Sequence, residues 1–140
     1  MRHLMILMSF ILWGSLAFAA EIPDDLVGKY EVTVILDGKD APTANIVTIK
    51  KNGNIILTER SVYGEITCYG KSIIEEDQDG RSLKSKVTCE DSGVVGGGVS
   101  YRQEIDLKGI NDFDNEFTTL VYTSLVGTSV PMRFKRILKD

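Results

Sequence analysis

The sequence predicts an all-β fold, an eight-stranded antiparallel up-and-down barrel, with a β-sandwich as the alternative. Three observations lead to this prediction. After the first twenty residues, no apolar stripe at 3.6-residue spacing persists over three turns, so helices are not expected. Short segments rich in β-branched and aromatic residues recur instead, separated by turn residues. Because a sheet of eight strands leaves exposed edges unless it closes or folds into two layers, closure is expected.

The start of the chain has the features of a cleavable signal peptide. A short basic start precedes an almost wholly apolar run, 4–18, and small residues occupy the two positions that a signal peptidase reads. The apolar run is too short for a comfortable membrane span, and no cysteine follows it that could carry a lipid anchor. We therefore expect a signal peptide at 1–19, a single barrel domain at 20–140, and no stable membrane anchor.

The expected strands follow one another with mostly hairpin-length connections. The first ends at Asp37-Gly38, a turn sequence. The second and third flank Asn52-Gly53, the strongest short hairpin signal in the chain. The fourth and fifth flank a turn at 77–80. The expected strands are 30–36, 45–51, 54–60, 65–74, 82–89, 99–107, 116–124 and 129–138.

Alternation within two strands predicts which side chains share a face. These are Tyr30, Val32, Val34 and Leu36 in the first strand, and Val99, Tyr101, Ile105 and Leu107, with Gln103 among them, in the sixth. Large inward residues could fill the barrel, whereas Gly70, Ser72 and Ser85 could leave room for a ligand. The sequence leaves both possibilities open.

The two cysteines, Cys68 and Cys89, are expected to form a disulfide. When an exported protein has only two cysteines, they more often form a structural disulfide than supply a catalytic thiol. The hairpin register supports the bond. If 77–80 forms the loop, Glu76 faces Arg81, and continued pairing brings Cys68 opposite Cys89. Directly opposed residues of an antiparallel pair lie ~4.5–5.5 Å apart, within disulfide reach.

Charge and composition exclude several classes of function. Removal of the signal takes away His3, the only histidine, and leaves fifteen basic against twenty acidic residues, a net charge of about −5. This acidity argues against nucleic-acid binding. Without histidine, Ser-His and Cys-His nucleophile pairs are absent, and zinc lacks its usual ligands. We therefore expect no enzyme, no cofactor and no metal.

Two acidic segments are candidate calcium sites. The segment 75–80 places carboxylates two apart before a glycine, as an EF-hand loop begins. Lys86 stands where that loop needs a bidentate glutamate, and strands flank the segment. Asp112, Asp114 and Glu116 form a second acidic patch in the segment 111–116. Solvated turns are the preferred interpretation of both.

The segment 91–98 is glycine-rich and has an apolar tip. In a meander it shares one barrel end with the connections at 37–43, 61–64 and 125–128. Binding residues often lie on loops held by a rigid scaffold, so this end is a candidate binding end. The alternative is a connector without a role. The candidate residues are Tyr63, Gly93, Val94, Val95, Gly96, Gly97 and Gly98.

The entry to the first strand and the last strand together resemble the lipocalins and related barrels of the calycin group. Those barrels open their first strand with glycine, any residue and tryptophan, and a late basic residue packs across the tryptophan ring. Here Gly28 and Tyr30 match the first feature, with tyrosine in place of tryptophan. The resemblance implies that Arg133 or Arg136 packs on Tyr30 and closes the barrel.

Three functions remain open. We expect foremost an exported, non-enzymatic protein that recognises a macromolecular partner through barrel-end loops, for example as an inhibitor; exported bacterial inhibitors of proteases and of lysozyme are similar in size, β-rich character and single disulfide. The alternatives are a lipocalin-like carrier of a small apolar ligand and a passive envelope or surface component. We expect a periplasmic or secreted location, and the lack of an Asn-x-Ser/Thr sequon favours a bacterial source.

Overall fold

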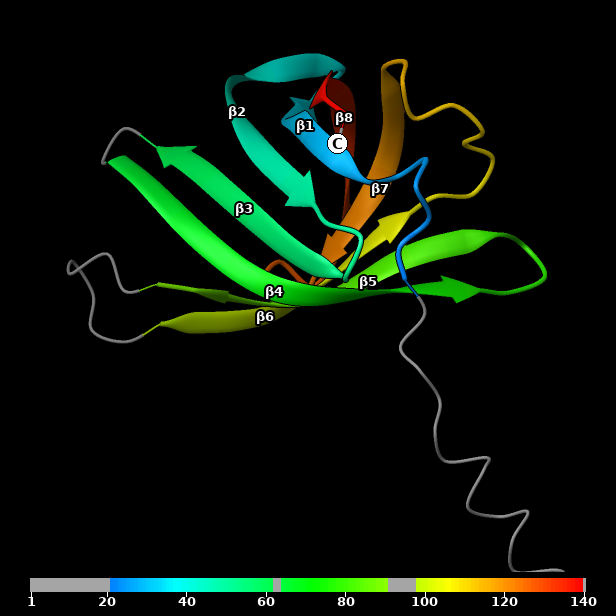
Figure 1. The fold of residues 1–140 in the computed structure, drawn as a ribbon. Helices are drawn as coiled ribbons and strands as arrows, with labels where there is room; N and C mark the ends of the chain where they lie inside the picture. Colours follow the sequence, from blue (N-terminus) through cyan, green and yellow to red (C-terminus); the bar gives the residue numbers. More distant parts are fainter. Residues whose placement is uncertain (1–20, 62–63, 91–97, 140) are drawn as a thin grey trace, which may run out of the picture.

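Each strand pairs with its neighbour in the sequence, and β1 also pairs with β8, so that the sheet closes on itself (Figure 1). The computed structural model describes residues 21–61, 64–90 and 98–139; the expected signal peptide at 1–19 lies outside them. The strands are β1 (Gly28–Leu36), β2 (Lys39–Ile49), β3 (Asn54–Ser61), β4 (Gly64–Glu76), β5 (Arg81–Cys89), β6 (Val99–Asp106), β7 (Phe117–Thr123) and β8 (Ser129–Leu138). The predicted closed barrel is therefore confirmed, in place of the alternative sandwich. In these described ranges, no helix is long and apolar enough to cross a membrane.

The hairpin of β4 and β5 has the predicted register from its turn to its disulfide. Glu76 lies opposite Arg81, and Cys68 lies opposite Cys89, to which it is bonded. Gly70 is required between them, because a Cβ there would lie 2.2 Å from the carbonyl oxygen of Lys86. A side chain at this position would push the two strands apart.

Two details of the first hairpin differ from the prediction. The strand β2 begins at Lys39 rather than at 45, so most of the expected loop 37–43 is strand. The register shifts between Thr33 and Ile35, and this irregularity turns the end of β1 outward: Leu36 is 59% exposed instead of facing the interior. Val99, at the start of β6, is also exposed.

The core fills the barrel with apolar side chains from its strands. Phe117 stacks on Phe134 with ring centroids 5.0 Å apart, and the edges of Tyr30 and Phe113 meet this pair. Such aromatic packing buries large apolar areas. The segment before β1 and the segment after β6 add buried residues at one end of the barrel, namely Ile22, Leu26, Val27, Leu107 and Phe113. They cover the end of the barrel that carries the β2–β3, β4–β5 and β6–β7 connections.

Candidate functional site

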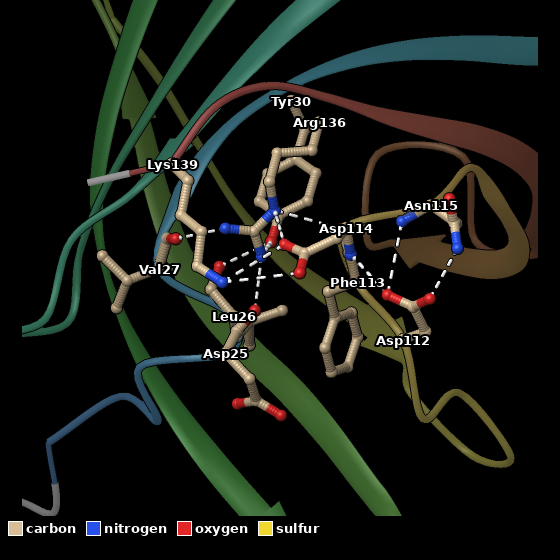
Figure 2. Close-up of polar contacts among 10 residues, drawn as sticks. All are labelled: Asp25, Leu26, Val27, Tyr30, Asp112, Phe113, Asp114, Asn115, Arg136 and Lys139. Carbon is tan, nitrogen blue, oxygen red and sulfur yellow. Dashed lines mark hydrogen bonds and ion pairs between the residues drawn. The ribbon is translucent and has the colours of Figure 1, made fainter.

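The Arg136 side chain lies at the covered barrel end and is only 5% exposed (Figure 2). Its guanidinium donates hydrogen bonds to the backbone carbonyls of Phe113, Val27 and Asp25, and to the hydroxyl of Tyr30. It also lies 4.9 Å from the centre of the Tyr30 ring and pairs with the carboxylate of Asp114. Arginine suits this place because its planar group offers five donors and stacks on aromatic faces. Arg136 thus joins the segment before β1, the segment after β6 and strand β8.

Of the two arginines considered for the contact with Tyr30, the structure places Arg136 there and Arg133 elsewhere. Arg133 forms an ion pair of 2.6 Å with Asp40, and its side chain is 36% exposed. Of the two alternatives, Arg136 contacts Tyr30 and Arg133 does not. Gly28 has a φ of +154°, and a Cβ there would lie 2.7 Å from the carbonyl oxygen of Leu138 and 2.9 Å from the guanidinium of Arg136. Glycine at this position lets the arginine approach the backbone.

Burial raises the pKa of two tyrosines of the barrel. Burial raises the pKa of Tyr30 to about 12, although the charge of Arg136 acts in the opposite direction. The Tyr30 hydroxyl donates to the carbonyl of Leu26 at 2.7 Å. Burial, with a smaller contribution from the charge of Glu59, raises the pKa of Tyr101 to about 12. Both hydroxyls therefore stay neutral well above the ordinary tyrosine pKa of 10.0.

Two tyrosines are therefore expected to ionise late in an alkaline titration followed by phenolate absorbance. Because their pKa values are raised in the folded state, the stability they contribute is present below pH 10 and is lost as the pH rises toward about 12. The variants Y30F and Y101F should each remove one late ionisation. The late step should disappear in denaturant, and its persistence there would contradict this assignment.

A short polar row crosses the inner wall of the barrel. The hydroxyl oxygens of Ser72 and Ser85 lie 2.7 Å apart, and Gln103 is the register partner of Ser85. Gln103 is 7% exposed, and its Oε1 is the one buried side-chain oxygen or nitrogen without a hydrogen-bond partner in the described part of the chain. A buried unpaired acceptor costs stability.

Replacement of Gln103 by methionine should therefore raise the free energy of unfolding by about 1 kcal/mol, since the apolar side chain keeps the length and removes the unpaired oxygen. Urea denaturation measures this change. The exposed Gln78, in the turn between β4 and β5, gives the matched control Q78M, for which little change is expected. A loss of stability in Q103M would mean that the amide has a polar partner in solution.

The acidic segments 75–80 and 111–116, the two candidate calcium sites, form turns with internal hydrogen bonds. Asp77 Oδ1 accepts from the amides of Asp79 and Gly80, and these bonds lower the pKa of Asp77. Asp112 accepts from Asp114 and from Asn115, and its pKa is lowered in the same way. These carboxylates are thus engaged by neighbouring donors, as in Asx turns.

A groove of about 500 Å³ crosses the outer face of the barrel between β4 and β7. Its outward side chains include Lys71, Ile73, Lys86, Arg102, Glu104 and Tyr122. A second cleft of about 390 Å³ adjoins it, and its charged lining residues are Asp77, Glu104, Asp106 and Lys108. Sequence reasoning missed the groove, although extending the hairpin register by one step from Gly70 and Val87 places Lys71 opposite Lys86.

The candidate residues of the glycine-rich barrel end fall mostly outside the described residues. These are Tyr63, Gly93, Val94, Val95, Gly96 and Gly97. Gly98 is described; it is exposed, and a Cβ there would lie 2.8 Å from the carbonyl oxygen of Cys89. The hypothesis that this end binds a partner therefore stays a prediction.

Comparisons with protein-family models, with curated proteins and with solved structures find no match for this chain.

Proposed function

We propose that the chain is an exported, non-enzymatic protein that binds a macromolecular partner with the outside of its barrel. The observation that carries the proposal is the packing of the interior. Apolar side chains from the strands form one buried cluster, and Arg136 ties the chain segments over one end. A protein whose interior is taken up by its own core recognises partners with its surface, where the groove between β4 and β7 lies.

The expectation of a non-enzymatic role depends on the chemistry of the side chains. The part of the chain after residue 19 contains no histidine, and its cysteines are bonded to each other. The tyrosines with raised pKa are poor bases and nucleophiles, because burial keeps them neutral. A binding role requires none of these groups to react.

An extracytoplasmic location is part of the proposal. The disulfide is compatible with an oxidising compartment, where such bonds persist. We also propose that the barrel is of the calycin type, with Gly28, Tyr30 and Arg136 in the positions that the resemblance implies. The stacking of Arg136 on Tyr30 supports this assignment.

The alternative of a carrier is favoured by one specific observation, the unpaired Oε1 of Gln103 beside the serine pair inside the barrel. A ligand that supplied a donor there would satisfy this oxygen. The ligand would then be partly polar rather than wholly apolar.

Native mass spectrometry of the protein, expressed with residues 1–140 and purified from an oxidising compartment, tests the proposal. We expect the mass of residues 20–140 less two hydrogens for the disulfide, and no bound small molecule. A ligand that copurifies and is released on denaturation would establish the carrier function and overturn the surface-binding proposal. The same spectrum reports cleavage of the signal peptide.

A further inference from the structure

Three cations stand side by side on the outer face of the barrel. Lys71 on β4 is the register partner of Lys86 on β5, and Lys86 is the register partner of Arg102 on β6. Neighbouring strands lie about 4.8 Å apart, so the row carries three like charges over roughly 10 Å. All three side chains are exposed, and no ion pair is recorded for any of them in the described part of the chain.

The next row of the same face has balanced charges. Lys84 forms an ion pair of 3.0 Å with Glu75 and is also the register partner of Glu104. Like charges directly opposite each other destabilise a sheet, whereas opposite charges stabilise it. The row of Lys71, Lys86 and Arg102, here called the cationic row, therefore lacks the compensation that the adjacent row has. An anion bound along the cationic row would supply it.

We propose that the cationic row binds an acidic, carboxylate-bearing segment of a protein partner; this inference rests on the proposed binding function. The groove of about 500 Å³ coincides with the row, which gives a bound segment a place to lie. The exposed side chains of Tyr69 and Ile73 flank Lys71 on β4, and Tyr122 lines the groove on β7. Tyrosine and arginine are enriched among the residues that dominate protein interfaces.

The surrounding charge favours a short acidic segment over a long polyanion. The adjoining cleft presents the three carboxylates of Asp77, Glu104 and Asp106 beside one cation, Lys108, and the net charge of residues 20–140 is about −5. A nucleic acid or a long sulfated glycan would extend beyond the three cations onto this acidic surface, where it is repelled. A segment with a few carboxylates and apolar neighbours stays within the groove.

The test is an NMR titration of the isotopically labelled protein with the peptide acetyl-Leu-Glu-Glu-Glu-Leu-amide. We expect amide shifts on the outer face of β4 to β7, weakening with added salt because exposed charges are screened. The variant K71Q/K86Q should bind about tenfold more weakly. The control K39Q/K135Q removes the same charge from exposed lysines of β2 and β8 and should bind as the wild type does.

Thermal unfolding gives a readout that does not depend on the peptide. Because K71Q/K86Q removes like-charge repulsion from the sheet, it should melt a few degrees above the wild type. A lower melting temperature would contradict the view that the row is uncompensated. Absence of peptide binding, or equal weakening in both variants, would overturn the proposed site.

A heparin oligosaccharide serves as the competing probe. Binding of the oligosaccharide without binding of the peptide would overturn the acidic protein segment in favour of an anionic glycan. Failure of this inference is distinguishable from failure of the proposed function. A copurified interior ligand in the native mass spectrum overturns the surface-binding function itself, whereas failed peptide binding with a ligand-free barrel overturns only the cationic row as the site.

Discussion

Replacement of Arg136 by methionine is expected to lower the free energy of unfolding by about 4 kcal/mol, because it removes a buried cation from its hydrogen-bond partners. Methionine keeps much of the side-chain volume, so the effect comes mainly from the carbonyls of Phe113, Val27 and Asp25, which lose their donor. The carbonyls of Phe113 and Val27 belong to buried residues, and each buried acceptor left unpaired costs about 1–3 kcal/mol, whereas the contact with Asp25 is exposed to water. Urea denaturation followed by circular dichroism measures the loss.

Arg133 provides a matched control on the same strand. Its ion pair with Asp40 lies at the surface, where such pairs contribute about 0.2–1 kcal/mol. R133M should therefore lower the stability only slightly. A similar loss in both variants would show that Arg136 acts by its charge alone and does not hold the covered end of the barrel together.

Reduction of the Cys68–Cys89 disulfide is expected to lower the free energy of unfolding by about 3 kcal/mol. The bond spans 21 residues of sequence, and in the chain-entropy description a cross-link of this span restricts the unfolded chain by that amount. Reduction leaves both side chains in place, so it isolates the cross-link from the packing of Cys68, which is fully buried. Denaturation with and without a reductant measures the difference.

The variant C68A/C89A separates the two contributions. It should lose the same cross-link stability and, in addition, about 1 kcal/mol for the atoms removed from the core at Cys68. The reductant should have no effect on this variant. If reduction of the wild type leaves its stability unchanged, the closed barrel already holds the hairpin and the disulfide is dispensable.

Much of the fold was predictable because turn chemistry determines register. Once the Asp77–Gly80 turn is placed, the antiparallel register of β4 and β5 is determined. Each residue outward on β4 pairs with the next residue outward on β5, and this continues to Cys68 and Cys89. The start of β2 was not predictable in this way. Pro42 lies in that strand, and proline usually argues against a strand. In the structure it falls where the β1–β2 ladder is interrupted, between the pairs that end at Asp40 and begin at Ala44.

The candidate sites are formed by residues that are far apart in the sequence, so sequence patterns predict them only in part. Lys71, Lys86 and Arg102 are separated by fifteen and sixteen residues, and the net acidity of the chain hides their alignment. The pairing of β5 with β6 across a connection of nine residues brings the third cation beside the others. The carbonyl acceptors of Arg136 belong to irregular segments, whose backbone path has no periodic signal in the sequence.

The closure of the sheet by β1 and β8 has a consequence for folding during synthesis of the chain. All other strand pairs join neighbours in the chain, whereas this pair joins the first strand of the barrel to its eighth, which is synthesised after the other seven. A nascent chain without β8 has open edges on β1 and β7, which are prone to pair with other chains. The barrel therefore cannot close before β8 has been synthesised. Closure of the sheet is thus the strand pairing that spans the largest separation in sequence.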